Sequence, residues 1–202
     1  MVAIIDYDAG NIRSVEKAVN SLGSEVMITR NANEILSQDH IILPGVGAFG
    51  DAMEKLSKYG LVDVIKEVAD RQIPLLGICL GQQLFFERSE ESEGVEGLGL
   101  LKGEVVKLPT ETGLKVPNIG WNSLELHNGG RLFKGIEEGS FVYFVHSYYC
   151  KAEQRDVVKA TIEYGTRADV SVEKGNIFAT QFHPEKSSDI GLKILDNFLQ
   201  VR

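Results

Sequence analysis

Residues 74–84 constrain the fold more than any other part of the chain. They read PLLGICLGQQL, an apolar run followed by a G-x-C-x-G turn and a helix-like stretch. Residues 75–78 predict a buried strand, and Gly77 and Gly81 supply the space that a sharp turn around Cys79 requires. A strand, a tight turn and a helix in this order are typical of a nucleophile elbow, here with Cys in the place of Ser.

The first half of the chain alternates strand-like and helix-like segments. We expect strands over residues 2–6, 25–29, 40–43 and 75–78, and helices over residues 12–22, 52–59 and 61–71. Asn11 is expected to cap the first helix, and Gly23 to end it. Strands that alternate with helices predict the α/β class, an open, mostly parallel twisted sheet with helices on both faces.

The second half is rich in strands, some of them antiparallel. We expect strands over residues 103–108, 119–126, 141–149, 157–164, 169–174 and 176–182. Residues 173–176 predict a hairpin turn, because Gly175 and Asn176 tolerate positive φ. A last helix is expected from about Ser188, on an apolar stripe of helical spacing. Because no repeat or linker appears, we expect residues 1–202 to form one domain.

Composition excludes several classes of function. The chain has 202 residues with 29 acidic and 21 basic side chains, a formal net charge of −8, which argues against binding to nucleic acid. The longest mostly apolar stretch, residues 75–86, is too short to cross a membrane and contains polar residues. The first residues lack a basic region before an apolar one, so they predict a strand rather than a signal peptide. We therefore expect a cytoplasmic protein without a membrane partner.

The two cysteines, Cys79 and Cys150, are predicted to be single thiols. Neither lies in a pattern with metal-ligand spacing, so we expect no metal and no cofactor. Cys79 is expected to stand exposed at a helix N-terminus, where free N–H groups favour the thiolate. The alternative is a small buried apolar residue, as most free cysteines are. The flanking glycines favour the nucleophile, whereas Cys150 has no such context and is expected to be structural.

Acyl chemistry at a cysteine also needs N–H donors for the oxyanion. One donor is expected from Leu80, directly after the nucleophile, and another from Val46 or Gly47 in the glycine-rich loop of residues 43–50. A purely structural turn is the alternative for that loop, and the two interpretations stay open. Because Gly45 and Gly47 flank Val46, we expect its peptide to rotate between a donor-in and a donor-out state, selected by a partner.

His183 is the predicted general base. Pro184 favours extended backbone at His183, and residues two apart in an extended segment share a face, so Glu185 is expected to accept one imidazole N–H. Together with Cys79 they form a predicted Cys/His/Glu triad. A surface ion pair is the alternative for His183 and Glu185. His146 competes as the base, but it has no carboxylate two residues on and is expected to line the site.

With these motifs in place, the chain resembles the class I (triad) glutamine amidotransferases and, within them, the glutaminase subunits of imidazole glycerol phosphate synthases. The resemblance covers essentially the whole chain. Besides the elbow, it rests on the segments Asp6–Asn11, Pro44–Gly50, Pro117–Asn122, Tyr143–Tyr148 and Gln181–Ser187. Two positions depart from the pattern, since Gln82 replaces a bulky apolar residue and Asn118 replaces His or Gln.

The resemblance implies a flavodoxin-like fold and a reaction in histidine biosynthesis. Glutamine is hydrolysed to glutamate and ammonia through a thioester on the cysteine. The ammonia passes to a cyclase subunit, a (β/α)8 barrel that forms a heterodimer with the glutaminase and makes imidazole glycerol phosphate and an aminoimidazole carboxamide ribotide. By the same resemblance, the residues that bind glutamine are Gly47, Gln83, Glu91, Ser147 and Tyr148. Those that face the cyclase are Asn11, Trp121, Asn122, Tyr143 and Lys186.

Two alternatives to this function remain at the level of sequence. One is a glutaminase that serves a different synthase, such as that of pyridoxal phosphate or anthranilate. The other is a redox-sensing or chaperone-like α/β protein, in which an elbow thiol is oxidised rather than acylated.

Overall fold

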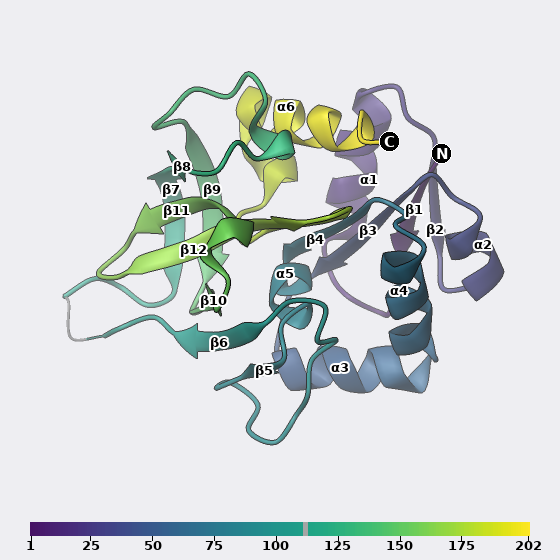
Figure 1. Ribbon diagram of the computed structural model, residues 1–202, viewed down its shortest axis with the longest axis horizontal. Coiled ribbons are helices and arrows are strands. Elements are labelled where there is room, and N and C mark those ends of the chain that lie inside the picture. The colour runs from purple at the N-terminus through teal and green to yellow at the C-terminus, as the bar shows by residue number, and fades with distance from the viewer. Residues whose placement is uncertain (111–112) are drawn as a thin grey trace.

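The core of the fold is a parallel sheet (Figure 1), seen in a computed structural model that describes residues 1–110 and 113–202. Its parallel strands lie in the order β2-β1-β3-β4-β13. These strands are β1 (Val2–Ile5), β2 (Val26–Thr29), β3 (His40–Gly45), β4 (Leu75–Cys79) and β13 (Ile177–Thr180). The predicted α/β class with a mostly parallel sheet is confirmed.

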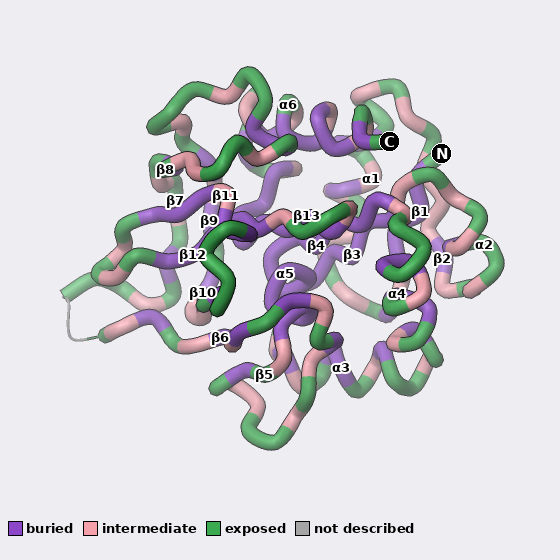
Figure 2. The backbone as a smooth tube through the Cα atoms, in the orientation of Figure 1, coloured by how far each residue is buried: buried purple, intermediate pink, exposed green. Residues whose placement is uncertain are grey.

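Helices cover both faces of this sheet. They are α1 (Ile12–Ser21), α2 (Ala32–Leu36), α3 (Phe49–Lys58), α4 (Leu61–Asp70), α5 (Leu80–Leu84) and α6 (Ser188–Leu199). Side chains of α1 and α6 pack on one face, and those of α2, α3, α4 and α5 on the other. Successive residues of one strand enter different cores, as Ile41 and Ile42 do. Strands buried on both faces explain why their sequences are apolar without alternation (Figure 2).

Further strands extend one edge of the sheet, and all their pairings are antiparallel except the outermost one, which is parallel. Beyond β13 the order continues β12-β10-β6-β5, with β11 beside β12 and β8 beside β11. These strands are β5 (Arg88–Ser89), β6 (Gly103–Lys107), β8 (Glu125–Leu126), β10 (Tyr148–Ala152), β11 (Val158–Glu163) and β12 (Arg167–Lys174). The predicted hairpin is confirmed, because Lys174 pairs with Ile177 across Gly175 and Asn176.

A separate two-stranded ribbon consists of β7 (Asn118–Ser123) and β9 (Phe141–His146). Two predicted strands were too long. Residues 119–126 divide at Leu124, and residues 141–149 divide at Ser147, where the chain leaves the ribbon and enters β10 of the main sheet. The short elements α2 and β5 were not predicted, since neither is long enough to show a period.

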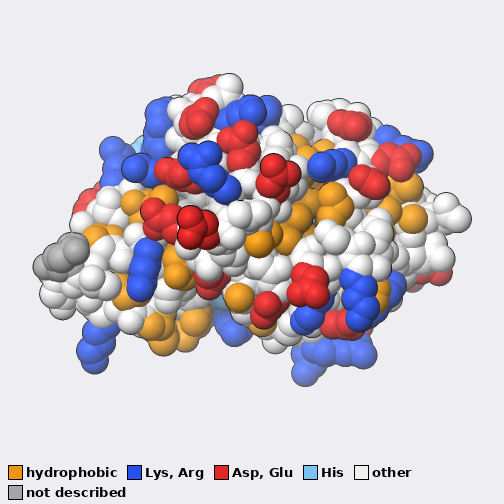
Figure 3. All heavy atoms as spheres, turned by 90° about the horizontal axis from the view of Figure 1, so that it is seen from below, with side chains coloured by type: hydrophobic (Ala, Val, Ile, Leu, Met, Phe, Trp, Pro, Cys, Tyr) orange, Lys and Arg blue, Asp and Glu red, His pale blue; other side chains and the backbone are white. Residues whose placement is uncertain are grey.

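Short 3-10 turns complete the fold: η1 (Arg131–Phe133), η2 (Arg155–Val157) and η3 (Pro184–Lys186). Among the described residues, no helix is both long and apolar enough to span a membrane. Figure 3 views the molecule from below and shows acidic and basic side chains interspersed over that face.

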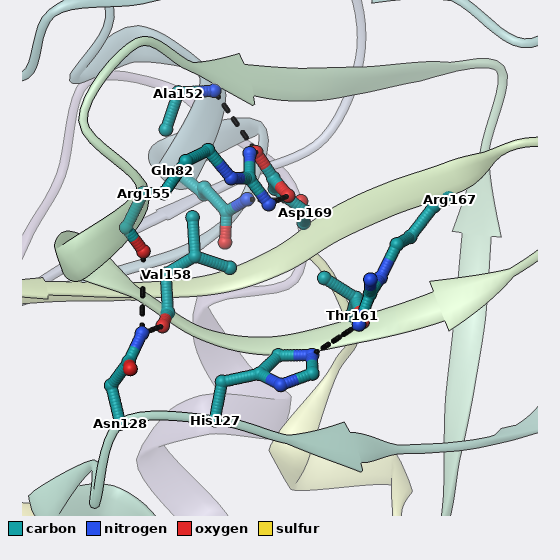
Figure 4. Close-up of polar contacts among 9 residues, drawn as sticks. All are labelled: Gln82, His127, Asn128, Ala152, Arg155, Val158, Thr161, Arg167 and Asp169. Atoms are coloured by element: carbon teal, nitrogen blue, oxygen red, sulfur yellow. Dashed lines mark hydrogen bonds and ion pairs between the residues drawn. The ribbon is translucent and has the colours of Figure 1, made fainter.

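A buried carboxylate ties the antiparallel strands together (Figure 4). The side chain of Asp169 in β12 is only 3% exposed, and its oxygens accept hydrogen bonds from Arg155 at 2.6 and 2.8 Å and from the Ala152 backbone N–H at 3.0 Å. The Asp169 backbone carbonyl accepts a hydrogen bond from the Gln82 amide at 3.2 Å. Asp169 therefore links β10 and η2 to the helix that follows the elbow.

We expect Arg155→Met to lower the free energy of unfolding by about 2 kcal/mol, because it leaves the buried Asp169 carboxylate without its cation. Urea denaturation measures this change. Arg88→Met is the matched control: its partner Glu104 is 35% exposed, against 3% for Asp169, so its loss should cost about 0.5 kcal/mol or less. Equal losses in the two variants would contradict this account of Asp169.

Candidate active site

The predicted sharp turn at Cys79 is present between β4 and α5. Cys79 has φ 56° and ψ −108°, a conformation that non-glycine residues rarely adopt. A Cβ on Gly77 would lie 2.7 Å from the Gly81 carbonyl oxygen, and one on Gly81 would overlap the Leu43 carbonyl. Both glycines of the motif are therefore required by close backbone approach.

The expected exposure of Cys79 is wrong. The residue is 6% exposed and lies in the wall of a cavity of about 240 Å³. Leu80 begins α5, whose residues are all buried and contact β4, β3 and α3, so the turn is enclosed instead of open to solvent. The thiol is reached through the cavity and not from the surface.

His183 and Glu185 form a buried pair at the same cavity. The Nδ1 of His183 donates to Glu185 Oε1 at 2.7 Å, and both side chains are almost completely buried. Burial lowers the pKa of His183, but hydrogen bonds to Cys79 and Glu185 and the negative charges of a Cys79 thiolate and the Glu185 carboxylate raise it more, to about 10. Because Nδ1 is held by Glu185, Nε2 is the nitrogen left to exchange a proton with Cys79. A buried pair excludes the alternative of a surface ion pair.

Asn11 lies at this pair instead of capping α1. It occupies the N-cap position with φ 74°, but its side chain makes no capping hydrogen bond, so the predicted cap is wrong. Its amide donates to Glu185 Oε1 and lies 3.4 Å from His183 Nδ1. Asn11 therefore helps to hold the Glu185 carboxylate, although the resemblance assigns it only to the partner face.

His146 is excluded as the base by its hydrogen bonds. Its Nδ1 lies 2.9 Å from the Tyr148 carbonyl, which accepts only, so Nδ1 carries the proton. Its Nε2 then accepts from the Asn118 amide at 3.1 Å. Burial lowers the pKa of His146 to about 4, so the ring is neutral at pH 7. Both nitrogens are occupied, and His146 lines the cavity as predicted.

The predicted oxyanion loop borders the cavity. Leu80, Val46 and Gly47 all line it, Val46 is 42% exposed, and Gly47 has φ 104° with open space around it. Gly45 differs, because any Cβ there would overlap the Tyr7 hydroxyl, which is itself bound to the Pro44 carbonyl at 2.8 Å. Of the two glycines that flank Val46, only Gly47 therefore has open space for a side chain, and a substitution at Gly45 would disturb packing.

The residues expected to bind glutamine also line the cavity: Gly47, Gln83, Glu91, Ser147 and Tyr148. Some of their polar atoms are already used within the protein. Glu91 accepts from the Phe49 backbone N–H at 2.8 Å, and Gln83 donates to the Tyr148 carbonyl at 3.2 Å. Gln181, whose amide contacts the Cys79 sulfur, was not predicted as a site residue; its sequence signal was its place two residues before His183.

One face of the β7–β9 ribbon is apolar and exposed beside the cavity. Ile119, Trp121, Phe141 and Val145 are 61, 49, 56 and 36% exposed. Ile119 pairs with Val145 and Trp121 with Tyr143, whose rings meet edge to face. Of the other residues expected at the partner face, Lys186 is exposed at the cavity and Asn122 donates to Asn118 at 3.2 Å.

Among residues 1–110 and 113–202, no group of His, Cys, Asp and Glu side chains is arranged to hold a metal ion. Cys150 is buried in β10, and burial raises the pKa of its thiol.

Comparison with known proteins gives the family. The family model described as "Glutamine amidotransferase class-I" matches residues 3–201. Imidazole glycerol phosphate synthase subunit HisH of Moorella thermoacetica is 53% identical over 98% of this chain and 93% of its own length. The HisH subunit of Methanocaldococcus jannaschii is 49% identical over all of both chains. A crystal structure of a glutamine amidotransferase superposes with a TM-score of 0.76 at 21% identity, over 98% of this chain and 99% of the other. The chain therefore belongs to the class-I glutamine amidotransferase family, in the group of imidazole glycerol phosphate synthase HisH subunits.

Proposed function

We propose that this chain hydrolyses glutamine to glutamate and ammonia, and that it supplies the ammonia to the cyclase subunit of an imidazole glycerol phosphate synthase. One observation carries the chemistry: His183, paired with the buried Glu185, lines the same cavity as Cys79. The similarity to HisH subunits supports an imidazole glycerol phosphate synthase over the synthases of pyridoxal phosphate or anthranilate.

The residues divide the reaction into two steps. His183 Nε2 accepts the proton of the Cys79 thiol, and the sulfur attacks the side-chain carbonyl carbon of glutamine. His183 then donates that proton to the departing nitrogen, so ammonia leaves and a γ-glutamyl thioester remains. Water, activated by the same imidazole, cleaves the C–S bond and releases glutamate. Glu185 stabilises the imidazolium throughout, as an opposite charge in contact with it does.

The backbone N–H groups of Leu80 and of the Val46–Gly47 segment are the proposed donors to the oxyanion of both steps. Gly47 lies in open space with positive φ, so its peptide is the one free to turn toward the substrate. Gln83, Glu91, Ser147 and Tyr148 are the proposed contacts of the glutamine itself, because they line the same cavity.

The apolar face of the β7–β9 ribbon is the proposed contact surface for the cyclase, a (β/α)8 barrel in a cytoplasmic heterodimer. Exposed aromatic residues beside a catalytic cavity are typical of a protein interface. Trp121, Asn122, Tyr143 and Lys186 are the proposed contact residues, with Asn11 behind them at the triad. A partner bound here would cover the cavity from which ammonia leaves.

We expect Cys79→Ala to abolish glutamine-dependent synthesis in the complex while added ammonia still supports the cyclase reaction. Only the glutamine-dependent reaction needs the thiol, so glutamine and ammonia as nitrogen sources distinguish the glutaminase activity from the cyclase activity. Turnover with each nitrogen source is the measurement. Cys150→Ala is the matched control and should retain both activities; loss of the ammonia-dependent reaction in Cys79→Ala would contradict the proposed division of labour.

We expect Glu185→Gln to move the alkaline limb of the glutaminase pH profile downward by about one pH unit. The carboxylate favours the charged imidazolium, so its loss lowers the pKa of His183 from about 10, and the proton needed by the leaving ammonia is lost at lower pH. The dependence of kcat/KM on pH from 6 to 10.5 tests this. An unmoved alkaline limb would exclude His183 as the acid.

We expect Trp121→Ala to weaken binding of the cyclase about 30-fold, since a central interface tryptophan contributes about 2 kcal/mol. The free energy of unfolding should change little, because half of the side chain is exposed in the free chain. Titration calorimetry of the two subunits gives the affinity. Unchanged affinity would place the interface elsewhere.

A further inference from the structure

A buried amide contacts the sulfur of the elbow cysteine. Gln181 follows β13 and is fully buried, and its Nε2 lies 3.7 Å from Cys79 Sγ, within hydrogen-bond distance of sulfur. Its backbone N–H donates to the Val170 carbonyl of β12 at 2.8 Å, which fixes the position of the residue. The family model and the names of the relatives assign no role to this side chain.

The orientation of the amide follows from its neighbours. The Tyr148 carbonyl accepts only, so the atom of Gln83 that lies 3.2 Å from it must be the nitrogen. That same nitrogen lies 3.1 Å from Gln181, so the facing atom of Gln181 must be its oxygen. The other end of the Gln181 amide is then the NH₂ group, and it donates to Cys79. The hydrogen bonds therefore run in one direction: Gln83 donates to Gln181, and Gln181 donates to Cys79.

Another polar neighbour of the thiol favours the protonated form. The Val145 carbonyl of β9 lies 3.8 Å from Cys79 Sγ and accepts a hydrogen bond from the thiol. A carbonyl oxygen in contact with a thiolate would repel it, so Gln181 is the uncharged donor that offsets this contact once the proton has moved to His183.

The titratable groups around Cys79 come from several elements. His183 precedes η3, Tyr7 follows β1, and Cys150 lies in β10. His146, Tyr148, Glu91 and Lys186 line the same cavity. Of these groups, His183 is the proton acceptor in the proposed reaction. Burial raises the pKa of the Tyr7 hydroxyl and that of the Cys150 thiol, so both stay protonated.

We infer that Gln181 is a further catalytic residue, whose amide N–H stabilises the Cys79 thiolate and holds its sulfur toward the cavity. The inference rests on the proposed function in that Cys79 is taken as the nucleophile. The S–H bond breaks as the N–H bond of His183 forms, and the donation from Gln181 persists through this transfer. Without it, the sulfur keeps the Val145 carbonyl, which favours the protonated thiol, and loses a donor that favours the thiolate.

Gln82 provides a matched control. It is also a fully buried glutamine, one turn of chain from Cys79, but its amide donates to the Asp169 carbonyl and not to the sulfur. Methionine has nearly the shape of glutamine without a donor. Gln181→Met and Gln82→Met therefore remove equivalent buried amides, of which only one contacts the thiol.

The test is the rate of alkylation of Cys79 by iodoacetamide between pH 5 and 10 in the full chain, followed by peptide mass spectrometry. The thiolate reacts, with a new S–C bond and loss of iodide, so the rate reports the thiolate fraction. We expect Gln181→Met to react roughly tenfold more slowly at pH 7, with its inflection at higher pH, because a hydrogen bond to the charged form is lost. Gln82→Met should match the unsubstituted chain.

Coincident profiles for Gln181→Met, Gln82→Met and the unsubstituted chain would overturn the inference. Should Gln181→Met fail to fold by circular dichroism, Gln181→Asn decides, since it keeps a neutral amide but is one methylene shorter and withdraws the donor from the sulfur; an unshifted profile there also overturns the inference. Alkylation requires no glutamine, so the result is separate from the proposed function. That function fails instead if the Cys79→Ala complex still hydrolyses glutamine.

Discussion

The backbone turn at Cys79 is the constraint on which the rest of the structure depends. A non-glycine residue with φ 56° and ψ −108° costs on the order of 1–3 kcal/mol, and the surrounding structure must hold it there. β4 lies between β3 and β13 in the sheet and is buried along its length, so packing on both faces supplies this support. Gly77 and Gly81 let the turn close against its own backbone and against β3.

Because the neighbours of β4 are parallel to it, their carboxyl ends meet at the same edge as the turn. The loop after β3 brings the proposed oxyanion donors, and the segment after β13 brings Gln181, His183 and Glu185. Segments about 100 residues apart thus converge on one sulfur through strand order alone, as expected for sites in open α/β sheets. Asn11, after β1, completes the carboxylate end of the triad.

Within the β7–β9 ribbon, strand β9 contributes to both the proposed catalytic cavity and the proposed partner surface. The Val145 side chain is exposed on the apolar face, while its carbonyl contacts the Cys79 thiol. His146, the next residue, is buried, neutral and bound to Asn118 of the paired strand. A strand alternates its side chains between two faces, so one short ribbon presents aromatic residues outward and closes the cavity inward.

The sequence by itself determined the parallel sheet, the elbow, and the pairing of His183 with Glu185, because each depends on local spacing: apolar runs, glycines around one cysteine, and a histidine two residues before a glutamate. The extended backbone expected for that last pair is wrong beyond His183, since Glu185 lies in the 3-10 turn η3. Only the tertiary structure decided that Cys79 is buried, that Asn11 binds Glu185 instead of capping α1, that residues 119–126 and 141–149 each divide, and that Gln181 contacts the sulfur. These features depend on which distant segments meet, and the order of strands in a sheet is set by packing of the whole core, which no local pattern records.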